Sequence, residues 1–450
     1  MRTTRRFSLS TTQVILLSFL LLVLVGSLLL ALPISAADGV AVSYIDALFT
    51  ATTATCVTGL VTLPTVTTWS VFGQAVLLVL IQVGGLGVIT VMSFLLVLTH
   101  RKLKLSDHLL LQDAFNLNSL SGLGAFVKKV VAGTLVVEGI GALLYMCVFI
   151  PQFGARGIWI SLFNAVSAFC NAGIDIFATD SLCQYATHPL INGVTAALIV
   201  LGGLGYIVWW DVLRILRDPH RRGWRYLTLH SKIALSMTAL LIVAGGAILF
   251  AAEYRNPATI GDMPLWQQIQ AALFQSVTTR TAGFAAIPQE NLTNGGALTS
   301  MLLMVVGGSP VGTAGGIKTV TIAVLATSAF STITGRQETT LFHRRIADSA
   351  VRKAVAVVGM FFTILFLSTL LLCLCTDAPF IDVVYETVSA TATVGLTRAL
   401  TPTLDTAGKL VIIATMYLGR IGPISLAIAL STRKKGVNSV KNPIEEISVG

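Results

Sequence analysis

Four stretches of this chain end in a glycine in the same way: TTATCVTGL at residues 52–60, SAFCNAGI at 167–174, SVTTRTAGF at 276–284 and SATATVGL at 389–396. The glycines, at positions 59, 173, 283 and 395, are separated by 114, 110 and 112 residues. Such a regular separation indicates one structural unit that is used four times in tandem. Four units around one axis would line a pore with one loop from each unit.

The composition places the chain in a membrane. Of its 450 residues, 54% are hydrophobic and 11% are charged, whereas soluble proteins have about 25% charged residues. So much apolar surface cannot be buried in one water-soluble core, and we expect a polytopic membrane protein. The six cysteines are scattered without metal-ligand spacing, so neither a metal centre nor a disulfide framework is predicted.

Each repeat has the same predicted parts. A first spanning helix of about 20 residues comes at residues 12–32, 130–150, 233–250 and 354–374. A short segment that suits a re-entrant helix precedes each glycine, at residues 44–53, 158–167, 265–277 and 381–389. A second spanning helix follows, at residues 71–98, 190–213, 298–325 and 409–430. The predicted fold is an all-α polytopic membrane protein with four tandem helix–pore-loop–helix repeats around one pseudo-fourfold pore.

The repeats predict four units in series, at residues 1–104, 105–220, 221–340 and 341–436, and a cytoplasmic C-terminal tail at 437–450. Most of the 30 Lys and Arg residues lie on the side of the two termini, and only Arg156, Arg255, Arg398 and Lys409 lie on the other. By the positive-inside rule we expect a plasma-membrane protein with both termini in the cytoplasm and pore loops that enter from outside. This topology also explains the net charge of +10, so nucleic-acid binding is not expected.

The four glycine loops carry the residues expected to bind an ion. A cation loses its water inside a membrane only where oxygen atoms replace it, and rings of main-chain carbonyls do this in channels. Glycine allows the unusual backbone conformation that turns carbonyls inwards. The predicted selectivity filter has four residues from each repeat: Val57, Thr58, Gly59 and Leu60; Asn171, Ala172, Gly173 and Ile174; Thr281, Ala282, Gly283 and Phe284; Thr393, Val394, Gly395 and Leu396. No ring of Asp or Glu accompanies them, so carboxylate selection of a divalent ion is not expected.

A second glycine motif follows each loop after 24 to 29 residues, reading GGLG at 84–87, GGLG at 202–205, GGSP at 307–310 and GRIG at 419–422. Small residues at this place allow helices to pack closely or to hinge, and in the first two copies close packing alone is a sufficient explanation. The third copy is too rich in Gly and Pro for a continuous helix, which predicts a broken helix with a gating loop below the filter; a passive kink is the alternative. The predicted gating residues are Gly307, Gly308, Ser309, Pro310, Gly312, Thr313, Gly315, Gly316 and Lys318.

Two arginines lie at membrane depth, where an unpaired charge is costly and a functional role is the default expectation. Arg420 stands where other copies have glycine, and we expect it to act as an electrostatic barrier under the filter; a structural ion pair is the alternative. Arg280 lies three residues before Gly283 and is expected to brace the loop from behind, with Glu386 and Asp46 as candidate counter-charges; repulsion of ions near the path is the alternative.

These motifs resemble the Ktr/Trk/HKT superfamily of potassium transporters over nearly the whole chain. The four loops match its filter loops, GGSPVGTAGGIKT at 307–319 matches its intramembrane gating loop, and YLGRIGP at 417–423 matches its pore-arginine region. Eight spans are most similar to the KtrB-type membrane subunit. In this superfamily, Ser at the first filter position is associated with Na⁺, so Gly59 favours K⁺. One departure is visible: Phe274 lies nine residues before its glycine, whereas the other repeats have an aromatic residue at ten, so the third pore helix is expected to end differently.

The resemblance implies K⁺ uptake across the plasma membrane through a channel-like pore. It also implies a homodimer, with one pore in each chain, and a cytosolic nucleotide-binding RCK ring (KtrA-like) that regulates it. The sequence leaves activation by Na⁺ open. It has no nucleotide-binding motif, so we expect no nucleotide bound by this chain and assign nucleotide control to the partner.

Two other classes of function compete with this hypothesis. A secondary transporter would couple a solute to Na⁺ or H⁺ at the broken helix, but such proteins usually show inverted repeats, and these four share one orientation. An enzyme is not expected, because all six histidines lie outside the predicted spans and no catalytic cluster is present.

Overall fold

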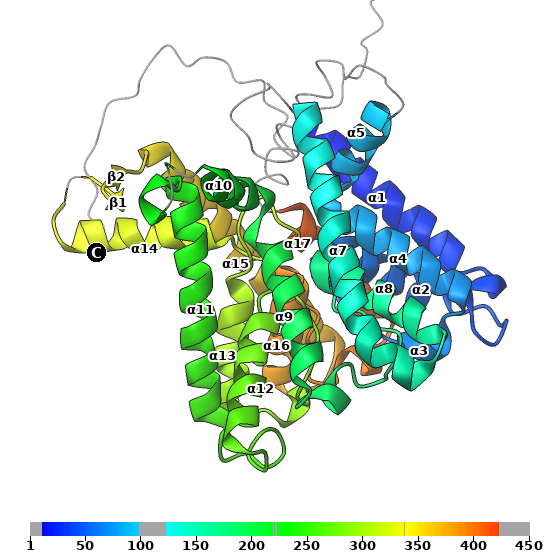
Figure 1. Ribbon diagram of the computed structural model, residues 1–450. Coiled ribbons are helices and arrows are strands. Elements are labelled where there is room, and N and C mark those ends of the chain that lie inside the picture. Colours follow the sequence, from blue (N-terminus) through cyan, green and yellow to red (C-terminus); the bar gives the residue numbers. More distant parts are fainter. Residues whose placement is uncertain (1–10, 99–122, 219, 221–222, 337, 423–450) are drawn as a thin grey trace, which may run out of the picture.

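The computed structural model describes residues 11–98, 123–218, 220, 223–336 and 338–422. This part of the chain is almost entirely helical (Figure 1). Its one sheet is an antiparallel hairpin of β1 (Thr340–Leu341) and β2 (Arg344–Arg345). The predicted tail at 437–450 and the end of the last predicted helix lie outside the described residues.

The first helix of each repeat is long and apolar. These helices are α1 (Thr11–Leu30), α7 (Leu123–Phe153), α11 (Leu229–Glu253) and α15 (Asp348–Cys375). In the described part of the chain, all four are long and apolar enough to cross a membrane. Their outer faces expose large apolar side chains, such as Leu143 and Phe366. Such faces suit contact with lipid, because burying them against hydrocarbon removes them from water.

A short helix precedes the glycine in every repeat, as predicted. These pore helices are α2 (Tyr44–Cys56), α8 (Arg156–Cys170), α12 (Leu265–Thr278) and α16 (Phe380–Ala392). With 13 to 15 residues each, they are shorter than the ~20 residues that a span requires. Each packs against the first helix of its own repeat, so it enters the molecule and ends inside it.

The second helix is interrupted in the first three repeats. Its parts are α4 (Val71–Leu86) and α5 (Val88–Leu98), α9 (Pro189–Leu204) and α10 (Tyr206–Arg217), and α13 (Asn294–Val305) and α14 (Thr319–Ile333). In the fourth repeat, α17 (Thr406–Ile421) reaches the end of the described residues. Between α13 and α14 lie residues 306–318, here called the intramembrane loop, and Figure 1 shows α14 lying across the direction of α11 and α13.

The continuous helices expected at 71–98 and 190–213 are wrong, because both bend sharply. The bends are 95° between α4 and α5 and 98° between α9 and α10. Gly87 and Gly205 stand at these bends with φ of +87° and +85°, and Gly422 after α17 has φ of +86°. With ψ of 133° to 143°, this backbone region is essentially restricted to glycine. Gly87 and Gly205 are therefore bends and not only packing residues, and Gly422 has the same backbone conformation.

The remaining helical elements are single turns in the loops. They are α3 (Thr65–Thr68) and five 3-10 turns: η1 (Pro33–Ser35), η2 (Cys183–Tyr185), η3 (Trp224–Tyr226), η4 (Gln289–Asn291) and η5 (Thr401–Thr403).

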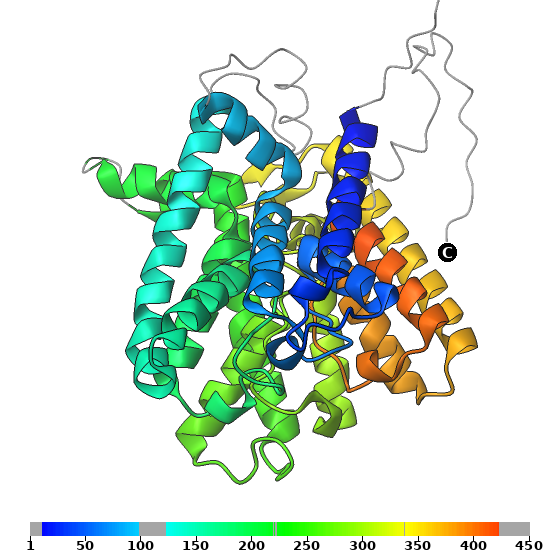
Figure 2. The ribbon, with the colours of Figure 1, turned by 90° about the vertical axis from the view of Figure 1, so that its right-hand side faces the viewer.

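The four repeats are arranged in sequence order around one centre. Helix α4 packs on α8, α9 on α12, α13 on α16, and α17 returns to α2. Figure 2 shows the blue first repeat between the cyan second repeat and the orange fourth. The contact between the last and the first repeat closes the ring, and it includes an ion pair between Lys409 Nζ and Asp46 Oδ1 at 2.6 Å.

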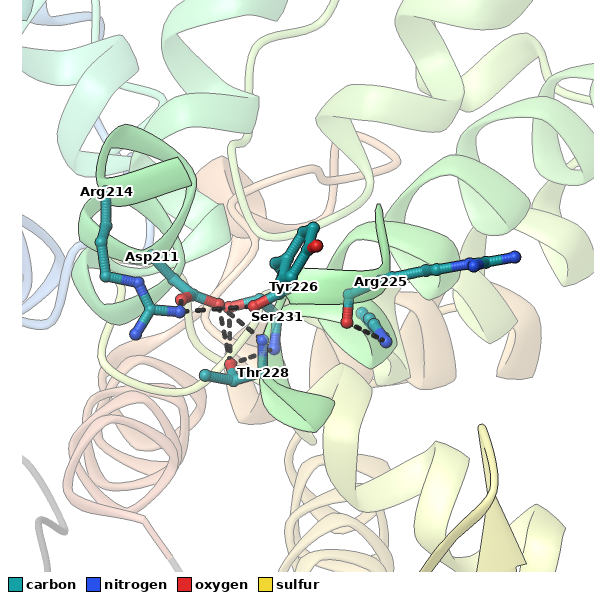
Figure 3. A network of polar contacts seen from close by, with 7 residues as sticks. Asp211, Arg214, Arg225, Tyr226, Thr228 and Ser231 are labelled. Carbon is teal, nitrogen blue, oxygen red and sulfur yellow. Dashed lines mark hydrogen bonds and ion pairs between the residues drawn. The ribbon is translucent and has the colours of Figure 1, made fainter. Parts of the chain in front are cut away.

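A polar network joins the second repeat to the third (Figure 3), near the end of the molecule where Figure 1 shows α10. Asp211 on α10 accepts hydrogen bonds from the main-chain N–H and the hydroxyl of Thr228, both at 2.9 Å, and pairs with Arg214 at 2.6 Å. Thr228 in turn caps the N-terminus of α11 through Ser231 N–H. The carboxylate therefore holds α10 against the start of the next first helix.

Candidate ion pathway

The four glycines meet at the centre of the molecule and form a closed ring. A Cβ placed on each glycine would collide with the carbonyl oxygen of the residue that precedes the glycine in the next repeat. The distances from this Cβ to the oxygen are 2.5 Å for Gly59 and Ala172, 2.5 Å for Gly173 and Ala282, 2.5 Å for Gly283 and Val394, and 2.2 Å for Gly395 and Thr58. The contacts run through the repeats in order and return to the first. We call these four residues the glycine ring.

The residue after each glycine anchors its loop from outside the ring. Leu60, Ile174, Phe284 and Leu396 are at most 1% exposed and belong to the hydrophobic clusters of the protein. Their apolar side chains point into the core, which leaves the main chain of the loops at the centre.

The residue two positions before each glycine has a left-handed backbone. The φ angles are 55° at Val57, 59° at Asn171, 70° at Thr281 and 53° at Thr393. This region is unfavourable for β-branched residues, so the surrounding structure has to hold it. In repeats 1, 2 and 4 the same residue caps the C-terminus of the pore helix. We call these four residues the inner ring.

A hydroxyl group near the end of each pore helix braces its loop, a role that was not predicted from the sequence. Thr53 and Ser389 accept hydrogen bonds from the N–H of Gly59 and Gly395, at 2.9 and 3.0 Å. Ser167 donates to the carbonyl of Ile174 at 2.6 Å, and Thr278 donates to that of Phe284 at 2.7 Å. The signal was present, since three of the four hydroxyls lie six residues before a glycine and the fourth lies five before.

The third loop differs from the others, as its sequence predicted. Helix α12 ends at Thr278, five residues before Gly283, whereas α2, α8 and α16 end three residues before their glycines. Thr279 and Arg280 form an additional turn, in which their N–H groups donate to Gln275 and Val277. The guanidinium group of Arg280 is directed outwards, and donates to Thr238 of α11 at 3.3 Å.

The expected counter-charges of Arg280 are wrong. Asp46 forms its ion pair with Lys409, and Glu386 accepts hydrogen bonds from the hydroxyls of Thr397, at 2.6 Å, and Thr401. Arg280 is 5% exposed and lies between its loop and α11. This placement behind the loop agrees with bracing and disagrees with a position in the path of an ion.

A cavity of about 510 Å³ lies on one side of the glycine ring, and all four glycines line it. Its wall also carries three carboxyl groups, of Asp175, Asp180 and Glu290. Asp175 follows Gly173 by two residues and is 9% exposed. Burial raises the pKa of the Asp175 carboxyl from 3.8 to about 7, although hydrogen bonds from Ser181 and the main chain of Ala178 oppose the shift. The cavity therefore forms an acidic mouth to the ring.

The intramembrane loop lies against the opposite side of the ring and is held by the main chain of the second repeat. Ser309 and Thr313 donate from their N–H groups to the carbonyls of Gly203 and Gly202, at 2.8 and 3.1 Å. The Thr313 hydroxyl donates to Phe169 in the last turn of pore helix α8, at 3.0 Å. Because these bonds replace the helical bonds that the broken segment lacks, the loop has a defined conformation.

The predicted gating residues make close contacts in this loop. The ends of the loop are tied by hydrogen bonds from Gly307 N–H to Ile317 and from Thr319 N–H to Gly308, both at 3.0 Å. The Nζ of Lys318 donates to the carbonyl of Ala314. The remaining members pack without space for larger residues: a Cβ on Gly312 would lie 2.8 Å from Gly202 O, Gly316 has φ of +65°, and Pro310 O lies against Gly205.

Arg420 joins the intramembrane loop to the first repeat. Its guanidinium donates to the carbonyl of Thr313 at 2.6 Å, and to those of Gly84 and Gly85 at 2.6 and 3.3 Å. The described residues provide no carboxylate partner for it. The alternative of a structural ion pair is therefore not supported, and the positive charge remains below the glycine ring.

The first glycine of each GxxG motif receives the end of a pore helix. A Cβ would lie 2.0 Å from Thr55 O at Gly84, 1.9 Å from Phe169 O at Gly202 and 2.2 Å from Thr391 O at Gly419. The third repeat is the exception, because a Cβ on Gly307 would lie 2.0 Å from Gly315 O of the intramembrane loop. The loop thus occupies the place that a pore helix takes in the other repeats.

The fold and the central ring define a class: a helical membrane protein in which four tandem repeats surround one axial passage. A family model described as TrkH, cation transport protein, matches residues 4–439. The chain belongs to the TrkH family of cation transport proteins.

Known proteins are similar to it over most of their length. The potassium/sodium uptake protein NtpJ of Enterococcus hirae is 38% identical, over 99% of this chain and 98% of its own. The Ktr system potassium uptake protein B of Bacillus subtilis is 37% identical, over 97% of this chain and 96% of its own. Among solved structures, the potassium transporter TrkH from Vibrio parahaemolyticus has the same fold, with a TM-score of 0.74, 14% identity and coverage of 96% and 87% of the two chains.

Proposed function

We propose that this chain takes up K⁺ into the cell through the passage between its four repeats. The observation that carries the proposal is the closed glycine ring, in which the carbonyl before each of Gly59, Gly173, Gly283 and Gly395 contacts the glycine of the preceding repeat. Such a ring can offer oxygen atoms in place of the water of a cation. The proposal also rests on the relatives, which are described as uptake proteins for potassium or for potassium and sodium.

The filter consists of the four residues of each repeat from the inner ring to the residue after the glycine. The pore helices favour a cation there, because their C-terminal, partly negative ends converge on the centre. The acidic mouth formed by Asp175, Asp180 and Glu290 would raise the concentration of cations at the entrance.

The intramembrane loop and Arg420 together form the gate. The loop lies under the glycine ring, and the guanidinium group of Arg420 bridges Thr313 of the loop to Gly84 of the first repeat. A positive charge at this point repels a cation that leaves the filter. Conduction would then require the loop and Arg420 to separate, which breaks a small number of identified hydrogen bonds.

The protein would work in the plasma membrane as a homodimer with both termini in the cytoplasm. The basic residues at the α10–α11 connection, including Arg214 and Arg225, are on the side that this orientation places inside. Regulation would come from a cytosolic nucleotide-binding RCK ring, since relatives are named as components of a Ktr system. Activation by Na⁺ would be a property of this assembly or of the filter.

The first test measures uptake of labelled K⁺ by the purified protein in liposomes, with unlabelled K⁺ and Na⁺ as competitors. The second test is growth of a K⁺-uptake-deficient strain on limiting K⁺, with and without the gene. We expect uptake that K⁺ inhibits better than Na⁺ and growth that depends on the gene. Absence of both, from protein that is inserted and folded, would reject the proposal. Omission of Na⁺ from the same assay reports whether Na⁺ activates uptake.

A further inference from the structure

A second cavity lies beside the acidic mouth, where the first repeat meets the second. Its volume is about 500 Å³. The two cavities lie on different sides of helix α3, because Thr65 lines the acidic mouth and the next residue, Val66, lines the second cavity. Much of the remaining wall comes from the starts of α4 and α8, with Trp69, Arg156 and Trp159. No residue of the filter, the gate or the mouth lines this cavity, which we call the lateral cavity.

The lateral cavity lies at the level where the protein meets the membrane surface. Helices α4 and α8 begin there, on the side of the acidic mouth, so the cavity is at the ends of the spans and not at their middle. Apolar side chains at the cavity are open to lipid: Val71 in its wall is 69% exposed, and Ile158 of α8 is 50% exposed. The tryptophans Trp69 and Trp159 are typical of the boundary between lipid and water. In the proposed orientation this boundary belongs to the outer leaflet.

The acceptor groups of the wall are already bound within the protein. Gln74 Oε1 accepts a hydrogen bond from Trp159 Nε1 at 2.9 Å, and Gln74 Nε2 donates to the Trp69 carbonyl at 3.0 Å. The Ser70 hydroxyl donates to the carbonyl of Ile34 at 2.7 Å. No Asp or Glu is among the described residues that line the cavity. The wall therefore offers little to a cation.

Two donors of the same wall are without a partner among the described residues. The side chain of Arg156 is exposed and forms no ion pair there. Trp69 is 1% exposed, and its indole N–H is buried without an acceptor, which in a native structure calls for a ligand or a water. Arg156 is also the first residue of α8, where the partial positive charge of the helix start adds to its own. These groups favour an anion, and a guanidinium group suits the oxygens of a phosphate.

We propose that the lateral cavity binds the headgroup phosphate of an anionic phospholipid, with Arg156 as its ion-pair partner and the Trp69 N–H as a further donor. The acyl chains lie along the exposed apolar faces next to Val71 and Ile158, which a soluble anion would leave unused. Such a lipid bridges α4 of the first repeat and α8 of the second. Because the site exists only in the folded protein, its occupation stabilises the fold.

The test follows the thermal stability of the delipidated full-length protein in detergent as dioleoyl phosphatidylglycerol is added. Phosphatidylcholine with the same chains tests the need for net negative charge, and inorganic phosphate tests a free anion. Arg156→Gln removes the cation, Arg156→Lys keeps it, and Trp69→Phe removes the N–H but keeps an aromatic ring. Arg255→Gln is the matched control, because Arg255 also belongs to the few basic residues on this side but lies over the ring of Tyr254 and outside the cavity.

We expect phosphatidylglycerol to raise the Tm of the wild-type protein, and Arg156→Gln to need at least about fivefold more lipid for half of this rise. Trp69→Phe and Arg156→Lys should lie between the two, and Arg255→Gln should match the wild type. An unchanged lipid requirement in Arg156→Gln would overturn the inference, as would equal stabilisation by phosphatidylcholine or by inorganic phosphate. These measurements involve no K⁺ flux, so their failure is distinct from failure of the proposed function.

Discussion

Each glycine of the central ring is required by a contact between repeats. The placed Cβ atoms at Gly59 and Gly395 fall 2.5 and 2.2 Å from carbonyl oxygens of the neighbouring loop. Real Cβ atoms do not approach other atoms so closely, so a side chain there would displace the very oxygen that could face an ion. Positive φ, +98° at Gly59 and +100° at Gly395, adds backbone strain to any substitution.

Gly59→Ser tests this requirement. Strain of about 1–3 kcal/mol corresponds to a roughly five- to 150-fold effect on a rate, so we expect K⁺ flux to fall at least about fivefold, and discrimination against Na⁺ to weaken. Liposome flux with K⁺/Na⁺ competition measures both. Gly139→Ser is the matched control, because a Cβ on Gly139 in α7 meets nothing within 4 Å. Equal flux in the two variants would show that the ring does not select the ion.

The second helices show how one motif serves different purposes. In repeats 1 and 2 the helix bends at Gly87 and Gly205, whereas in repeat 3 Pro310 stands at the corresponding position and the helix opens into the intramembrane loop. In repeat 4 the motif carries Arg420, which reaches Thr313 of that loop and Gly84 of the first repeat. Three second helices thus meet through the guanidinium group and the loop.

Two substitutions of Arg420 separate its charge from its hydrogen bonds. At an effective dielectric constant of about 20, a charge about 8 Å from an ion opposes it by roughly 2 kcal/mol. We therefore expect Arg420→Ala to raise K⁺ flux at least about tenfold. Arg420→Lys keeps the charge but cannot bridge the carbonyls of Thr313 and Gly84 in the same way, so its flux should be intermediate. Reduced flux in Arg420→Ala, with normal amounts of protein in the membrane, would instead assign the residue a structural role.

The molecule as a whole places an acidic cavity on one side of the ring and a positive charge on the other. The cavity belongs to all four repeats, since all four glycines line it, and its carboxyl groups come from the loops after α8 and α12. A cation is therefore attracted at the mouth and repelled below the filter. The difference in electrostatic potential between the two sides depends on the charge state of Asp175.

External pH should control uptake through Asp175, which faces Asp180, Glu290 and the thiol of Cys183 across the cavity. With a pKa of about 7, its carboxyl gains a proton as the external pH falls from 8 to 6, and the mouth loses a negative charge. We expect K⁺ uptake to fall about threefold, equivalent to roughly 0.6 kcal/mol of lost attraction. Uptake measured at both pH values in liposomes checks this.

The control for this pH effect is Glu290→Gln, because the Glu290 carboxyl lines the same cavity, whereas the charge of Asp180 itself raises the pKa of Asp175. It should lower uptake at both pH values and keep the ratio between them, whereas Asp175→Asn should abolish the ratio. Stability moves in the opposite sense, because a carboxyl pKa that folding raises stabilises the protein at low pH, and this contribution is lost as the pH rises through about 7. If uptake by Asp175→Asn still differed between pH 8 and pH 6 as in the wild type, the pH effect would not come from Asp175.

Features that depend on neighbours in the chain were predictable. The four pore helices, the glycine after each, the early departure of the third loop and the break after Val305 all follow from short-range rules: helix length, the freedom of glycine and the poor helix propensity of residues 307–316. One copy of the glycine pattern is weak evidence, but four copies at regular spacing were enough to predict the arrangement of repeats.

Features that depend on partners far along the chain could not be predicted from the sequence. Asp46 pairs with Lys409, 363 residues away, and this left Arg280 to donate to Thr238 instead of a carboxylate. Arg420 finds its acceptors 107 and 336 residues away, and the bends at Gly87 and Gly205 could equally have been packing sites. A residue's type limits its backbone angles and its preference for water or lipid, and both act locally. Its partner is whichever group the closed ring of repeats brings within reach, and only the folded chain contains that information.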